Sequence, residues 1–112
     1  MIDINELTLG QVKQLQLAFG VGKSAEHPYE IGEPYFIRTV TFHLTGRLVA
    51  VTEQELVIED AAWIADDGRF MDAMKTGAFS EVEPYPDGKV IIGRGSLIDA
   101  HKVKFSLPRS QK

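Results

Sequence analysis

Apolar and polar residues alternate with a period of two from Tyr35 to Leu44, and nearly all of them are β-branched or aromatic. This pattern is typical of a β-strand. Thr45 and Gly46 predict a short turn after it. Residues 47–51 and 56–64 then predict two further strands, joined by a polar segment. The middle of the chain is therefore predicted to be an antiparallel meander.

A helical period precedes the strands. Apolar residues recur at three- and four-residue steps over residues 9–19, at Leu9, Val12, Leu15 and Phe19. Thr8 and Gln11 have the spacing of a capping box, and Gly20 provides a left-handed stop. The pattern predicts an amphipathic helix over residues 9–19. Glycines and prolines in residues 21–34 predict a linker after it.

The second half of the chain carries shorter apolar runs. Asp66 or Asp67 is predicted to cap a short helix over residues 69–75, which Gly77 ends. Residues 83–88 are rich in turn formers. Residues 90–92 and 97–98 predict two short buried strands, and alternation over residues 102–107 predicts a last one.

One helix followed by at least five short strands cannot bury the strand faces in a flat sheet. We therefore expect a mainly β protein: an N-terminal helix and a small, strongly bent, five-stranded antiparallel barrel with a short helical insertion. The expected divisions are the helix (1–20), the linker (21–34), the barrel (35–107, with an insertion at about 61–88) and a polar tail (108–112).

Composition narrows the class of protein. The 112 residues are 44% hydrophobic and 25% charged, which is typical of a folded domain. A net charge of −4 opposes non-specific binding to a phosphate backbone, so any contact with nucleic acid must be a local patch. Without cysteine there is no disulfide and no thiolate zinc ligand. Since no apolar run is long enough to span a membrane and the first residues are acidic, we expect a cytoplasmic protein.

Two segments resemble the paired motifs of Sm-like proteins, small ring-forming barrels that bind RNA. The first is Gly46, Leu48 and Val51 followed by the run Leu-Val-Ile-Glu-Asp-Ala at 56–61. The second is Val-Ile-Ile-Gly-Arg-Gly-Ser-Leu-Ile at 90–98. The resemblance implies a cyclic homo-oligomer of about five to seven subunits. Residues 35–70 also resemble small phage-encoded proteins, some of which are similar to Sm-like rings.

The resemblance implies a candidate ligand-binding set of Arg94, Gly95, Ser96 and Glu55. Arg94 and Gly95 match the second motif, where the arginine packs on a base and the glycine admits the backbone. The family's Asp and Asn, which hold a base, correspond to positions near Thr52 and Glu55, so the Asn is missing here. Arg94 between two glycines is equally well explained as a tight turn with an exposed arginine.

Other candidate chemistry is weaker. The histidines at 27, 43 and 101 are scattered and lack metal-ligand spacing, so we expect no metal and no cofactor. Glu81 and Glu83 are expected in a solvated turn. Trp63 is flanked by small apolar residues, which favours the core or a subunit interface over base stacking. No nucleophile, base and orienting group have workable spacing, so we expect no enzymatic activity.

Three functions remain in order of preference. The first is a non-catalytic homo-oligomeric ring that binds single-stranded RNA or small nucleotides. The second is a phage structural or host-interaction protein, such as one that neutralises a host defence factor, without nucleic-acid binding; net acidity and the missing Asn favour it. An enzyme comes last. If the chain is phage-encoded, its expected location is the host cytoplasm.

Overall fold

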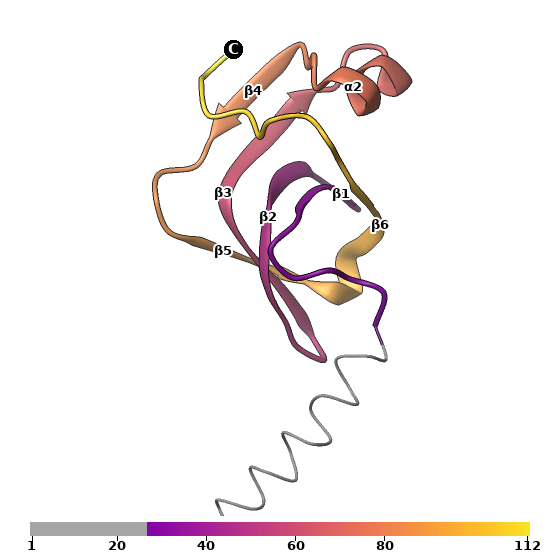
Figure 1. Ribbon diagram of the computed structural model, residues 1–112, viewed down its shortest axis with the longest axis vertical. Coiled ribbons are helices and arrows are strands. Elements are labelled where there is room, and N and C mark those ends of the chain that lie inside the picture. Colours follow the sequence, from indigo (N-terminus) through magenta and orange to yellow (C-terminus); the bar gives the residue numbers. More distant parts are fainter. Residues whose placement is uncertain (1–26) are drawn as a thin grey trace, which may run out of the picture.

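The computed structural model describes residues 27–112, which form a strongly bent antiparallel sheet and a short helix (Figure 1). The elements are β1 (Pro34–Thr39), β2 (His43–Val51), β3 (Glu55–Asp66), α2 (Phe70–Thr76), β4 (Glu81–Pro84), β5 (Lys89–Gly93), the 3₁₀ turn η2 (Arg94–Ser96) and β6 (Leu97–Lys102). The predicted mainly β, bent antiparallel architecture with a short helix is confirmed. The predicted helix over residues 9–19 lies outside the described residues.

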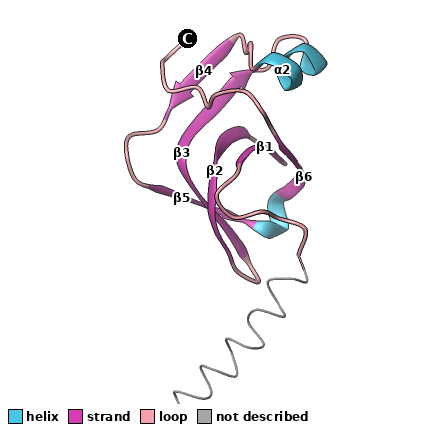
Figure 2. Cartoon of the chain, viewed as in Figure 1, coloured by secondary structure: helices cyan, strands magenta, loops and turns pink. Residues whose placement is uncertain are grey.

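The sheet has the strand order β4-β3-β2-β1-β6, and β5 also pairs with β3 (Figure 2). The long strand β3 pairs with β5 through its first half and with β4 through its second half, both on the edge that faces away from β2. The sheet therefore has six strands where five were predicted. The additional strand, β4, falls inside the predicted insertion. It was not predicted because a single apolar residue between two glutamates is too short a run to establish a strand period.

The predicted turn at Thr45 and Gly46 is wrong. The chain turns over residues 40–42 instead, where the Thr39 hydroxyl accepts hydrogen bonds from the backbone N–H of Thr41 at 3.3 Å and of Phe42 at 2.8 Å. Gly46 lies within β2, where an added Cβ would approach the Ile58 Cδ1 atom to 2.6 Å. The glycine is thus explained by close packing against β3 and not by a turn.

Apolar clusters pack on both faces of the sheet. The inner face of the bend holds one cluster: Tyr35, Ile37, Leu44, Leu48, Leu56, Ile58, Ala61 and Ile92. The opposite face holds a second, formed with α2 and the following loop: Phe36, Ala62, Ile64, Ala73, Phe79, Val82 and Val103. Neighbouring residues of a strand point to opposite faces. With both faces buried, apolar residues occur at consecutive positions of β1.

The short helix α2 closes the second cluster through its buried residue Ala73. Gly77 ends the helix in the left-handed conformation at φ 77°, as predicted. The predicted aspartate cap is wrong, because Arg69 holds the N-cap position without a side-chain hydrogen bond. The Asp66 carboxylate instead accepts a hydrogen bond from the Gly68 N–H.

The tail after β6 forms no strand among residues 103–107, contrary to the prediction. It crosses from β6 to the outer edge of β4 (Figure 1). There Lys112 exchanges two backbone hydrogen bonds with Val82, at 3.0 and 2.9 Å. Arg109 also donates to the carbonyls of Ala61 and Tyr85. The chain itself thus occupies the edge of β4.

The outer edges of β5 and β6 are unpaired within residues 27–112. The two strands exist as predicted, although their burial was overestimated. Ile91 on β5 and Ile98 on β6 expose 65% and 62% of their surface. Within the same residues, no helix is long and apolar enough to span a membrane.

Candidate functional site

The structure brings Arg94 against the loop between β2 and β3. Arg94 begins η2, directly after β5, and is half-buried. Its Nη1 atom donates to the Thr52 carbonyl at 2.6 Å, and its backbone N–H donates to the Gln54 carbonyl at 2.8 Å. These two bonds fasten the 3₁₀ turn to the loop, so that two segments far apart in the sequence form one surface.

An aromatic side chain that the sequence analysis did not single out completes this cluster. The Arg94 guanidinium lies over the ring of Tyr29, 5.7 Å from its centroid, within the range of a cation–π contact. Tyr29 in turn packs edge-on against Tyr35, with centroids 6.2 Å apart. Tyr29 lies in the predicted linker. An aromatic residue within a proline- and glycine-containing segment was the signal available in the sequence.

The other predicted ligand residues gather at the same end of the sheet. Ser96 donates through its hydroxyl to the Gly93 carbonyl at 2.8 Å. An added Cβ at Gly95 would meet nothing within 4 Å, so the backbone there is open to approach. Glu55 begins β3 opposite Gly93, and its carboxylate lies 3.4 Å from the Thr52 hydroxyl. Their role in binding stays a prediction.

Arg94 is held by hydrogen bonds to backbone carbonyls. No ion pair joins it to a carboxylate within residues 27–112, yet one of its donors is engaged by a backbone carbonyl. A guanidinium has five N–H donors, so most of them stay available. A fixed guanidinium beside an aromatic ring and an open backbone is suited to binding a planar, electron-rich ligand such as a nucleobase.

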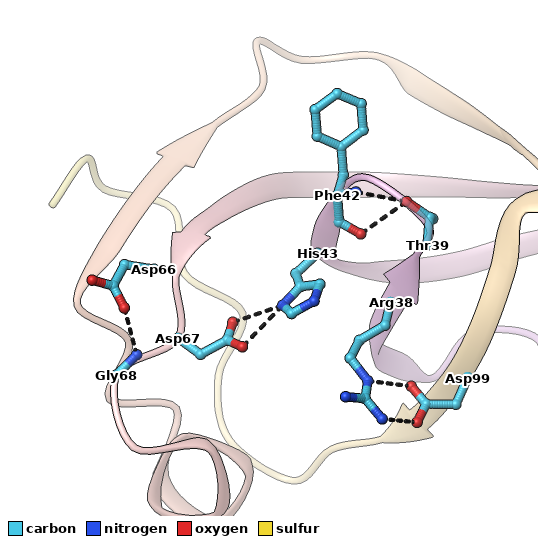
Figure 3. A network of polar contacts seen from close by, with 8 residues as sticks. All are labelled: Arg38, Thr39, Phe42, His43, Asp66, Asp67, Gly68 and Asp99. Carbon is cyan, nitrogen blue, oxygen red and sulfur yellow. Dashed lines mark hydrogen bonds and ion pairs between the residues drawn. The ribbon is translucent and has the colours of Figure 1, made fainter.

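A second polar cluster runs across three strands. Arg38 of β1 lies directly opposite His43 of β2 and Asp99 of β6 (Figure 3). The guanidinium forms a two-pronged ion pair with the Asp99 carboxylate, with Nε–Oδ1 at 2.8 Å. His43 Nδ1 lies 2.9 Å from the carboxylate of Asp67. His43 therefore connects β2 to the segment that follows β3.

The histidine and aspartate pair has the geometry that orients an imidazole for proton transfer. Among the described residues, however, no hydroxyl hydrogen-bonds to His43, and no three metal-binding side chains come together. The Arg38 guanidinium also lies over the Phe70 ring, 4.9 Å from its centroid, which links this polar cluster to α2. The cluster is therefore best explained as a tie between the sheet and α2.

The ion pair shifts the pKa of both partners. The hydrogen bond from Arg38 lowers the pKa of Asp99 below its usual value, against the opposing effect of desolvation. The same bond raises the pKa of Arg38. At the other end of β6, the carboxylate of Glu30 lies 3.0 Å from the Lys102 amine and raises the pKa of that lysine.

The lowered pKa of Asp99 predicts a pH-dependent contribution to stability. A carboxyl group whose pKa is lower in the folded state stabilises the fold above its unfolded pKa, and loses that contribution as the pH falls through the folded pKa. Asp99→Asn should therefore lower the free energy of unfolding slightly at neutral pH, and the difference from wild type should vanish in acid. Urea unfolding at several pH values measures it. Asp87→Asn, at an exposed position without an ion pair among the described residues, is the control. A constant difference across pH would contradict the assignment.

No family model matches the chain. No curated protein matches it. Among solved structures, the chain is similar to a crystal structure of the P. aerophilum SmAP1 heptamer, with 16% sequence identity and a TM-score of 0.49. The match covers 80% of this chain and 95% of that one. At this degree of similarity, the assembly of that protein does not transfer to this chain.

Proposed function

We propose that the protein assembles into a closed homo-oligomeric ring by pairing the edge of β5 in one copy with the edge of β6 in the next. The observation that carries this proposal is the pair of open edges. Both strands lack an outer partner among the described residues, and each exposes a large aliphatic side chain, Ile91 on β5 and Ile98 on β6. Open, apolar strand edges are templates for pairing with another chain.

The two open edges differ from each other and lie at opposite ends of the sheet order. A contact between unlike edges is head-to-tail, so it closes into a ring when the rotation per subunit permits. The edge of β4 is excluded from this contact, since Lys112 already pairs with Val82. About five to seven subunits is the size that the motif resemblance implies.

The proposed ligand of this ring is single-stranded RNA or a small nucleotide, bound without catalysis at the Arg94 loop. Support comes from the Arg94 guanidinium over Tyr29 and from the open backbone at Gly95. Repetition of the site around a ring would let one ligand contact several subunits at once, which raises the overall affinity above that of a single site. The overall acidity and the nearby Glu55 require these contacts to be local.

Substituting Arg94 tests the ligand. Arg94→Ala should weaken binding of a single-stranded RNA oligonucleotide by about five- to ten-fold, because a charged donor is lost. The free energy of unfolding should fall by about 1–2 kcal/mol, since one hydrogen bond to a carbonyl and the cation–π contact with Tyr29 are removed. Fluorescence anisotropy at two salt concentrations, with weaker binding at higher salt, measures the effect.

Arg69→Ala is the matched control, since this arginine is highly exposed at the start of α2 and should leave oligonucleotide binding unchanged. Equal losses of oligonucleotide affinity in the two variants would mean that net charge alone explains the effect. Absence of wild-type binding at both salt concentrations would favour the alternative, a phage structural or host-interaction protein. That alternative is supported by the carbonyl bond that already engages Arg94 and by the carboxylate at Glu55.

A further inference from the structure

A groove lined by aromatic residues lies at the end of the sheet, where β3 passes β4. Its walls are Phe42, Trp63, Glu83, Pro84, Tyr85 and Pro86, and they enclose about 310 Å³. The rings of Phe42 and Trp63 lie 6.1 Å apart and are nearly perpendicular, at 85°. Trp63 is 40% exposed and lies outside the core of the single chain, while the predicted alternative of a subunit interface stays a prediction.

Strand register places these side chains. Trp63 lies opposite Leu44 of β2 and opposite Glu83 of β4, so the three share one face of the sheet. Leu44 is buried in the inner cluster, whereas Trp63 and Glu83 lie farther along the same face and are exposed. The neighbouring Tyr85 is fixed by the hydrogen bond from its N–H to the Ala61 carbonyl at 2.9 Å. Prolines on both sides of Tyr85 restrict its backbone further.

The groove also carries a negative charge. Both carboxylate oxygens of Glu83 accept from the neutral Gln111 amide at 3.1 Å, and no cation pairs with them within residues 27–112. Arg109 of the tail donates to the carbonyls of Ala61 and Tyr85. Aromatic faces with one unpaired carboxylate attract a cation and repel phosphate.

We propose that this groove binds a trimethylated ammonium group carried on a lysine side chain of a partner polypeptide. Two perpendicular rings can both contact a rounded trimethylammonium group, whereas a planar guanidinium stacks on only one of them. An unmodified lysine amine is strongly hydrated and loses more on entering an apolar groove.

The surroundings of the groove favour a polypeptide as the carrier. Val40, two residues before Phe42 in the same β1–β2 turn, is 70% exposed, so the turn offers a partner chain a second apolar side chain. A partner chain that presents the side chain would cover this residue. The proposal does not depend on the ring or on the Arg94 loop.

Trp63 is the only tryptophan in the sequence, so intrinsic fluorescence reports directly on the groove. Tetramethylammonium chloride, at ionic strength matched with sodium chloride, should change the fluorescence to saturation, and neutral tert-butanol at equal concentration should not. A peptide with trimethyllysine should bind about ten-fold more tightly than the same peptide with unmodified lysine. An equal response to tert-butanol, or equal binding of the two peptides, would overturn the proposal.

Variants separate the charge from the apolar surface. Glu83→Gln keeps the tryptophan and should weaken the trimethyllysine peptide about five-fold. Glu81→Gln makes the same charge change on the same strand outside the groove walls and should have no effect. Near-ultraviolet circular dichroism verifies that both variants are folded. If the two variants weaken binding equally, or if a proline-rich peptide or an oligonucleotide binds the groove more tightly, the proposal fails.

Discussion

If the proposed ring forms, Ile91→Glu and Ile98→Glu, made separately, should each reduce it to a single chain of 12.4 kDa. In a head-to-tail ring every contact includes one β5 edge and one β6 edge, so either substitution alters all contacts at once. Both side chains are exposed in the single chain. In the proposed contact they would be covered, so a glutamate at either position would place an unpaired charge there. Multi-angle light scattering at micromolar concentrations gives the mass.

Met71→Glu on α2 is the matched control. It places the same charge at an apolar side chain that is 61% exposed, away from both open edges. This variant should keep the wild-type mass. All three variants should retain the wild-type free energy of unfolding of the isolated chain to within about 0.5 kcal/mol, as exposed substitutions usually do. A wild-type protein that is itself monomeric would refute ring assembly, and a mass loss in Met71→Glu would refute the assignment to the edges.

Among these substitutions, Phe36→Ala should lower the free energy of unfolding the most. Phe36 is fully buried on the face of the sheet that α2 covers. Its ring stacks on Phe79 with centroids 5.8 Å apart, and it meets Phe70 and His43 edge-on. Removing a buried phenylalanine from such a cluster costs about 3–5 kcal/mol, a large part of the stability of a small domain. Guanidinium unfolding followed by circular dichroism measures the loss.

Phe42→Ala makes the same chemical change at a half-exposed position. The edge contact with Trp63 is lost at a site that stays half-exposed, so the free energy of unfolding should fall by less than about 1 kcal/mol. Similar losses in the two variants would mean that the packing around Phe36 contributes no more than a surface contact. The comparison thus isolates burial from residue type.

The closed edge of β4 and the open edges of β5 and β6 have a common physical cause. The tail after β6 is long enough to return across the sheet, where Lys112 takes the place of a neighbouring strand beside Val82. Unpaired backbone groups at an edge are satisfied only by solvent or by another chain. Since the tail satisfies only β4, the outer edges of β5 and β6 stay open within residues 27–112.

Some features were predictable because the signals that encode them are local. Strand-forming residues, the helix stop at Gly77 and the turn at Arg94 between two glycines all depend on the conformations of neighbouring residues. The sequence by itself thus determined a mainly β chain with a short helix. It also singled out the loop of Arg94, Gly95 and Ser96, although it did not show what Arg94 contacts.

Tertiary structure alone decided the features that depend on contacts between distant segments. Gly46 was interpreted as a turn residue, because nothing in the sequence shows that Ile58 of the next strand presses against it. Tyr29 packs under Arg94, and Trp63 forms a wall of the groove. Both contacts join residues that lie far apart in the chain and are brought together only by folding. Hydrophobic alternation specifies that a residue faces one side of a sheet. Only the folded chain determines whether that side is covered, because coverage depends on where the rest of the chain packs.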